Sequence, residues 1–276
     1  MANIGATIAF YKVETALTKA NNEVSKSMER LATGRANANA GDRSSYVAMS
    51  DTFRLDYSGT KAGIKGASVA MGYLETGMRV LDAGSSLLSR LQELAILGAN
   101  DTNTTDDGNA IDAEAQALAT EFERLMTEST YKGKNVFVTQ AAQDVVALGG
   151  RGAKMNFGIA ALTLTSLVGT GGTLAAKPSS GKTTSTVLTA RIEAIQKKIN
   201  TARVQAGSQY AALESNVNYT TDLTAQYELA FNLVNDVNFS METAHLAKNQ
   251  ILQQAATAML AQANQGQQGL LQLIQV

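Results

Sequence analysis

The chain has 276 residues, with 23 lysines and arginines against 24 aspartates and glutamates, one histidine and no cysteine. The lack of cysteine excludes disulfides, thiolate metal sites and thiol catalysis, and a single histidine excludes multi-histidine metal sites and argues against a histidine-based triad. The net charge of −1 argues against binding nucleic acid or an anionic membrane through bulk charge. We therefore expect no metal, no cofactor, no nucleic-acid or membrane partner and no enzymatic activity.

Long helices are expected on both sides of the single proline, Pro178, because proline is the residue that most strongly interrupts a helix. No stretch of about 18 apolar residues is present, so no transmembrane helix is expected. The first residues lack the basic segment of a secretory leader. This indicates a cytoplasmic protein, unless a dedicated export machine reads another signal.

Three helices are predicted before residue 130, because apolar or small residues recur there at intervals of three and four. Their positions are Val13, Leu17, Ala20, Val24, Met28 and Leu31; then Ile64, Ala67, Met71, Leu74, Met78, Leu81, Ser85 and Leu88; then Ile111, Ala115, Leu118, Phe122 and Leu125. The second series has the period of a coiled-coil seam. Residues 34–41 are expected to break the first helix. Only a short polar loop, 100–108, joins the second and third helices, so these two are expected to pack antiparallel.

The pattern changes between residues 131 and 187 to short β-prone pieces and glycine-rich turns. Residues 131–137 predict a turn followed by a short strand, and residues 145–148 and 162–168 predict further β-structure. Residues 179–186 are rich in serine and threonine and are expected to form a loop. We expect this region to form hairpins that lie on the helices.

Helical spacing returns at Leu188 and continues to Ile274. The first positions of this series are Leu188, Ile192, Ile195, Ile199, Ala202, Ala206, Tyr210, Leu213 and Val217. The predicted fold class is therefore mainly α, with a long antiparallel coiled-coil helical bundle formed by both termini and a small β-hairpin region in the middle. We expect a terminal coiled-coil domain from 1–40 and 236–276. An inner helical domain is expected from 41–137 and 188–235, and a short β/loop region at 138–187.

Both ends of the chain are uncharged, since no charged side chain occurs in residues 1–11 or after Lys248. The polar side of the last helix consists of glutamine and asparagine, whereas a solvated helix face normally carries charged residues. Neutral amides suit a face that is buried between subunits. We therefore expect the ends to become ordered on self-assembly. The alternatives are a soluble tail of low charge and a helix at a membrane interface, although the latter normally carries lysine and arginine.

Four motifs in this order point to one protein family. They are Met28-Glu-Arg-Leu-Ala-Thr-Gly34, Leu88-Ser-Arg-Leu-Gln-Glu-Leu-Ala95, Tyr131-Lys-Gly-Lys-Asn-Val-Phe137 and Gln250-Ile-Leu-Gln-Gln-Ala-Ala-Thr-Ala-Met-Leu-Ala-Gln-Ala-Asn-Gln265. The last run resembles the C-terminal signature of bacterial flagellins, and the first resembles the family's Glu-Arg-Leu-Ser-Ser-Gly pattern. The similarity covers residues 1–137 and 188–276, so the chain looks like a minimal flagellin with short or absent outer domains.

The resemblance implies a structural subunit that polymerises with itself into the extracellular flagellar filament for motility. It also implies export of the unfolded chain through the flagellar type III apparatus, with an export chaperone, a filament cap and junction proteins as partners. The alternatives are a hook–filament junction protein of the same superfamily and a secreted enzyme or adhesin. The residues expected at subunit contacts are Ile4, Ile8, Leu252, Met259, Leu260, Leu270 and Ile274.

The resemblance implies two further kinds of site. Arg90, Leu94 and Glu114 match positions through which a toll-like innate immune receptor contacts recognised members; an exposed helix face or a subunit contact is the alternative for Arg90 and Glu114. The residues that resemble O-glycosylated outward loops are Thr183, Thr184, Ser185 and Thr186, with an unmodified loop as the alternative. His245 is expected to be packed or to lie at an interface.

Overall fold

The computed structural model describes residues 8–39, 41–149, 151–162 and 174–274; the side chains of residues 8, 9, 267 and 269–274 lie outside this description. The chain forms two compact units. We call Met1–Leu55 together with Gln226–Val276 the terminal unit, and Asp56–Ala225 the central unit.

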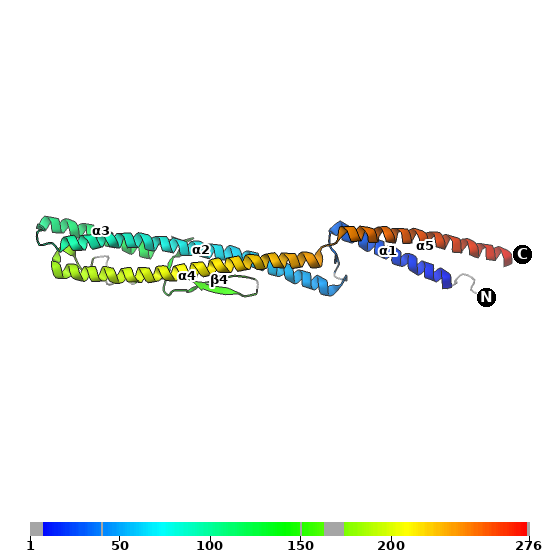
Figure 1. Ribbon diagram of the computed structural model, residues 1–276, viewed down its shortest axis with the longest axis horizontal. Helices are drawn as coiled ribbons and strands as arrows, with labels where there is room; N and C mark the ends of the chain where they lie inside the picture. Colours follow the sequence, from blue (N-terminus) through cyan, green and yellow to red (C-terminus); the bar gives the residue numbers. More distant parts are fainter. Residues whose placement is uncertain (1–7, 40, 150, 163–173, 275–276) are drawn as a thin grey trace. The chain divides into compact units, whose positions relative to one another are not determined.

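Five long helices make up most of the described chain, which confirms the predicted mainly α fold class (Figure 1). They are α1 (Ile8–Thr33), α2 (Ser44–Gly98), α3 (Thr105–Glu128), α4 (Lys182–Asn235) and α5 (Phe239–Ile274). The predicted breaks after residue 33 and between residues 98 and 105 are confirmed. Helices α2 and α4, of 55 and 54 residues, each contribute to both units.

Helices α2, α3 and α4 lie side by side in the central unit (Figure 1). The predicted antiparallel packing of α2 and α3 is confirmed, because Arg90 is ion-paired with Glu114 while Gly84 faces Phe122 further along α3. Helix α4 also runs antiparallel to α2. The hydroxyl of Ser85 donates to the Gln196 side chain at 3.1 Å, and the Gln92 amide donates to the Thr189 hydroxyl at 3.2 Å.

The seam of α2 differs in half of its positions from the prediction. Ala67, Leu74, Leu81 and Leu88 are buried as expected. The other four predicted positions, Ile64, Met71, Met78 and Ser85, are only partly buried. In each case the residue one position earlier is buried instead; these residues are Gly63, Ala70, Gly77 and Gly84. Small residues at these points let neighbouring elements approach the helix backbone closely. In α4 the predicted seam is confirmed at Leu188, Ile192, Ile195, Ile199, Ala202, Ala206 and Leu213.

Close approaches at two glycines, Gly63 and Gly98, explain where chain segments dock on α2. A Cβ on Gly63 would lie 2.3 Å from the carbonyl oxygen of Leu148, and a Cβ on Gly98 would lie 2.5 Å from the Cβ of Pro178. Contacts this short are sterically excluded, so both positions require glycine. The glycines therefore seat the segments that follow α3 and precede α4.

The residues between α3 and α4 form short strands that pack on the helices. Strands β1 (Thr130–Tyr131) and β2 (Lys134–Asn135) pair antiparallel, as do β4 (Asp144–Ala147) and β5 (Lys154–Phe157), while β3 (Phe137–Val138) and β6 (Ile159–Ala160) pair parallel. The expected β-structure at 131–137 and 145–148 is thus confirmed. Strands β5 and β6 were not predicted, and the expected strand at 162–168 lies almost entirely outside the described residues.

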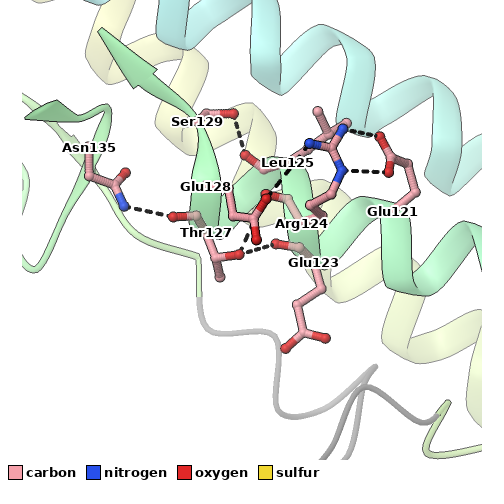
Figure 2. Close-up of polar contacts among 8 residues, drawn as sticks. All are labelled: Glu121, Glu123, Arg124, Leu125, Thr127, Glu128, Ser129 and Asn135. Carbon is pink, nitrogen blue, oxygen red and sulfur yellow. Dashed lines mark hydrogen bonds and ion pairs between the residues drawn. The ribbon is translucent and has the colours of Figure 1, made fainter. Parts of the chain in front are cut away.

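Helix α3 has well-defined ends. At its start Thr104 and Asp107 form a reciprocal capping box, which satisfies backbone N–H groups that the helix itself leaves free. Near its end Arg124 donates two hydrogen bonds to Glu121 and lies 3.8 Å from Glu128 (Figure 2). The Ser129 hydroxyl donates to the Leu125 carbonyl, and the Asn135 amide donates to the Thr127 carbonyl (Figure 2). The last bond ties strand β2 to the end of the helix.

The loop expected at residues 179–186 is mostly helical, so that prediction was wrong. Pro178–Ser180 form a short 3₁₀ helix, η1, and α4 begins at Lys182. Gly181, at φ 102°, separates the two. Asp112 accepts hydrogen bonds from the backbone and hydroxyl of Ser179. Serine and threonine favour loops in isolation, but here contacts with α3 hold η1 in place and α4 can start directly after it.

In the terminal unit, α1 and α5 run antiparallel. The Gln253 amide donates to the Asn21 side chain at 2.7 Å. Arg30, which comes later in α1, lies 3.7 Å from Glu242, which comes earlier in α5. At their base two loops pair: the N–H of Ala36 donates to the Asn235 carbonyl and the N–H of Val237 donates to the Gly34 carbonyl. These backbone bonds join the segment that follows α1 to the segment that precedes α5.

Candidate subunit-interface surfaces

The two units differ in how well they bury apolar side chains. The hydrophobic core belongs to the central unit, where it runs along α2, α3 and α4. Among the described residues of the terminal unit, only Ala20 and Ala256 are buried hydrophobic residues. Burial of two alanines provides little of the apolar contact that normally stabilises a helix pair. The terminal unit therefore lacks a core of large side chains within the described part of the chain.

Large apolar side chains of the terminal unit instead face solvent. The exposed residues are Tyr11, Met28, Tyr46, Met49, Leu55, Leu229, Leu233, Phe239, Met241, Ile251, Leu252 and Met259. Leu233 is the extreme case, with 85% of its surface exposed. Soluble monomers rarely expose apolar surface so densely, and such surface indicates contact with another molecule.

A groove of about 520 Å³ lies between α1 and α5. Its walls are mainly apolar: Val13, Ala16 and Ala20 come from α1, and Leu252, Ala255, Ala256 and Met259 come from α5. Charged side chains enter it only from α1, at Lys12, Lys19 and Glu23. The wall contributed by α5 thus carries the uncharged character that the sequence shows after Lys248.

The predicted contact residues fall into two groups. Leu252 and Met259 are exposed and line the groove, and Leu260 is half-buried. Ile4 lies outside the described residues, and for Ile8, Leu270 and Ile274 only the backbone is described, in α1 and α5. The assignment of all seven to subunit contacts stays a prediction.

Several exposed apolar residues of the terminal unit were not predicted. Met28 was placed on the buried face of its helix, yet it is exposed and the neighbouring Ser27 is buried. Leu229 and Leu233 were not predicted because heptad spacing selects the apolar residues of the buried face, and these two lie on the exposed face of α4. Counting apolar residues that lie off the seam would have found them.

A metal site and a membrane-spanning helix each impose requirements that can be compared with the described part of the chain. No cluster of three or more histidine, aspartate or glutamate side chains there is arranged to hold a metal ion. None of the helices in that part combines the length and apolar character that spanning a bilayer requires. His245 is exposed on α5, so it is not packed within the chain, and its place at an interface remains a prediction.

Comparison with known proteins decides the family. A model of the bacterial flagellin N-terminal helical region matches residues 4–142, and a model of the C-terminal helical region matches residues 189–274. The chain belongs to the bacterial flagellin family. Membership makes it a structural component of the bacterial flagellar filament, and the resemblance of the four motifs is confirmed.

Relatives of similar length share about a quarter of the sequence. The chain is 27% identical to a flagellin of Halalkalibacterium halodurans, with 92% of each chain aligned. It is 28% identical to the flagellar filament 33 kDa core protein of Treponema phagedenis, with 94% of each chain aligned. Among solved structures, the crystal structure of Bacillus cereus flagellin is 26% identical and has a TM-score of 0.46; the match covers 56% of this chain and 88% of that one.

The candidate receptor-contact residues of this family member lie in different environments. Arg90 and Glu114 are exposed and paired at 2.8 Å, and Arg90 also binds Glu93. Hydrogen bonds to Glu93 and Glu114 raise the pKa of Arg90 above its usual value. Leu94, however, is 1% exposed and belongs to the core, so its proposed role as a surface contact is corrected. Its neighbours Ile96 and Leu97 are the exposed apolar residues at this end of α2.

The candidate O-glycosylation residues lie in the first turns of α4 rather than in a loop. Thr183 and Thr186 are exposed, and Thr184 is half-buried. Ser185 is 3% exposed and its hydroxyl donates to the Pro178 carbonyl at 2.8 Å. A glycan on Ser185 would break this bond and would need space inside the packed junction, so this residue is removed from the set.

Proposed function

We propose that the chain polymerises with copies of itself and that neighbouring copies cover the apolar surfaces of its terminal unit. The observation that carries this proposal is the contrast between two buried alanines and a dozen exposed large apolar residues in that unit. Each Leu, Ile, Phe or Met side chain buried in an assembly contributes about 1.5–3 kcal/mol. A few such residues per contact suffice to drive association.

The contacts in an open helical polymer join two different surfaces of the subunit, because a surface that pairs with itself closes into a dimer. The groove between α1 and α5 supplies one apolar surface, with Leu252 and Met259 on its α5 wall. Exposed residues of α2 and α4 in the terminal unit, such as Met49 and Leu233, supply another. The missing charge on α5 after Lys248 supports this assignment, since no ionic group in that stretch has to lose its hydration on burial.

We further propose that the chain leaves the cell unfolded through the flagellar type III apparatus and assembles outside it. The weak internal packing of the terminal unit supports this route, because segments with few buried contacts unfold locally at low cost. An export chaperone that covers the exposed apolar helices, a filament cap and junction proteins are the partners that such a route requires.

Seeded polymerisation tests the proposal. Purified full-length chain is mixed with sheared filament seeds and a precipitating salt, and the product is examined by negative-stain electron microscopy. We expect long uniform tubes from the full-length chain and none from a variant that lacks about the last 25 residues of α5. Tubes from the truncated variant would contradict the proposal, and persistent monomers of the full-length chain would favour a hook–filament junction protein.

A further inference from the structure

The methionines of this chain are distributed unevenly between the two units. Among the described residues, the exposed methionines are Met28, Met49, Met241 and Met259, and all four belong to the terminal unit. In the central unit Met126 is 4% exposed, and Met71, Met78 and Met155 are partly buried against the core. Because the chain has no cysteine, methionine thioethers are its only sulfur groups open to oxidation.

Met259 occupies the most consequential position of the four. It is 58% exposed and lines the groove between α1 and α5 together with Leu252, Ala255 and Ala256. The thioether is an apolar, flexible group suited to filling an irregular apolar contact. The charged side chains that line the groove, Lys12, Lys19 and Glu23, all come from α1, so a polar group on Met259 would have no ionic partner on its own helix.

We propose that Met259 is an oxidation site of the free subunit and that its sulfoxide blocks polymerisation. This inference rests on the proposed function, since it requires the groove to be covered by another copy. A peroxide transfers one oxygen to the sulfur: the O–O bond breaks, an S–O bond forms, the sulfur is oxidised by two electrons, and the peroxide is reduced to water or an alcohol. The sulfoxide is polar and no longer fits an apolar contact.

The same geometry predicts protection after assembly. A methionine that another subunit covers is inaccessible to peroxide, whereas one in the free subunit is not. The block is also reversible: methionine sulfoxide reductase with a dithiol removes the oxygen as water, and the dithiol becomes a disulfide. Free subunits are therefore open to oxidative control, and assembled subunits are not.

The test compares subunits with and without hydrogen peroxide treatment. Mass spectrometry of proteolytic peptides measures the sulfoxide fraction at each methionine, and seeded polymerisation measures the critical concentration. We expect Met259 to be oxidised at least tenfold faster than Met126. The critical concentration of the oxidised chain should rise at least tenfold, equivalent to about 1.4 kcal/mol per added subunit. Treatment with the reductase should restore the original value.

Two matched variants assign the effect. Met259→Leu keeps the volume and apolar character of the side chain and cannot be oxidised. It should polymerise after peroxide treatment with less than a threefold change. A variant with Met28, Met49 and Met241 all changed to leucine, which keeps Met259, should stay sensitive.

The outcomes separate this inference from the proposed function. Quantitative sulfoxide at Met259 without any change in polymerisation would overturn the inference, and so would undiminished sensitivity of Met259→Leu. If the untreated chain fails to extend seeds, the proposed function itself is wrong. Should Met259→Leu polymerise poorly before treatment, the variant that lacks Met28, Met49 and Met241 decides the inference: loss of polymerisation on oxidation and recovery with the reductase support it, and insensitivity to peroxide overturns it.

Discussion

Gly77 of α2 and Ile159 of β6 approach so closely that a Cβ on Gly77 would lie 2.3 Å from the Cδ1 of Ile159 and 2.8 Å from a methyl group of Val136. Both Ile159 and Val136 are fully buried and cannot move into solvent. We expect Gly77→Ala to lower the free energy of unfolding by about 1–3 kcal/mol, the usual cost of overpacking a core.

Gly207→Ala is the matched control, because Gly207 lies inside α4 and a Cβ there would meet no atom within 4 Å. Alanine is the better helix former, so this change should stabilise the chain by about 0.5–1 kcal/mol. Urea unfolding, monitored by far-ultraviolet circular dichroism, measures the free energy of unfolding of both variants. Equal shifts in the two variants would mean that helix propensity, not the contact with Ile159, determines the result.

The ion pair between Asp56 of α2 and Arg151 predicts a dependence on acid. Arg151 donates hydrogen bonds of 2.5–3.2 Å to the buried carboxylate, and these bonds hold the pKa of Asp56 below its usual 3.8. A carboxyl group whose pKa is lower in the folded state stabilises the fold above the unfolded-state pKa and loses this effect as the pH falls through the folded-state pKa. The stabilisation is therefore complete at neutral pH.

We expect Asp56→Asn to cost about 1–2 kcal/mol at neutral pH. The difference from the unaltered chain should shrink as the pH falls from about 5 to about 2. Unfolding midpoints measured across this range check the prediction. A difference that stays constant with pH would show that Asp56 contributes through packing rather than through its charge.

The hydroxyl of Tyr73 donates to the carbonyl oxygens of Val136 and Asn135, at 2.7 and 3.0 Å. Burial raises the pKa of Tyr73 to about 12, and the nearby charge of Asp144 adds to this effect. Protonated Tyr73 thus stabilises the fold, and this stabilisation is complete at a pH below the unfolded-state pKa of about 10. The stabilisation is lost as the pH rises toward the folded-state pKa of about 12.

Tyr73→Phe should cost about 1–3 kcal/mol at neutral pH, because it removes the donor to a buried carbonyl group. Its alkaline unfolding should also depend less on pH above about 10. Tyr219→Phe, at an exposed position of α4, is the control and should leave both properties unchanged. The prediction fails if Tyr73→Phe and Tyr219→Phe unfold alike.

Leu252→Gln tests the α5 wall of the groove without adding charge. The exposed leucine makes no contribution to the core of the central unit, so the unfolding of the monomer should not change. The critical concentration for seeded polymerisation should rise about tenfold, equivalent to about 1.4 kcal/mol. Val204→Gln, at an exposed apolar position of the central unit, should have a smaller effect. Similar effects of both substitutions would place the main contact outside the groove.

The helices and their seams were predictable wherever large apolar residues mark the buried face. Leu188, Ile192, Ile195 and Ile199 of α4 were assigned to the core from spacing alone, and all four are buried. In α2 the same reasoning selected Met71 and Met78, while Ala70 and Gly77 beside them face the core. A hydrophobic pattern cannot identify a glycine as a contact residue, because the contact is made by the side chain of a distant partner such as Ile159.

Surface residues were harder to assign than buried ones. Leu94 and Ser185 were expected at the surface, and both are buried. The reason in each case is a contact outside the residue's own helical turn: Leu94 joins the hydrophobic core, and the Ser185 hydroxyl donates to the carbonyl of Pro178 in η1. Such contacts depend on how elements pack, which the local sequence does not encode.

The sequence by itself determined the helical class, the break at residue 34, the antiparallel order of α2 and α3, and the uncharged ends. These properties follow from composition and periodicity, which act along a single segment. Only the tertiary structure decided that three of the four unpredicted seam positions of α2 are glycines, and that the described terminal unit buries two alanines while exposing Leu233 and Met259. Whether a side chain is buried depends on the residues that surround it in the folded chain. Helical spacing predicts which face of a helix is apolar, but it does not determine what covers that face.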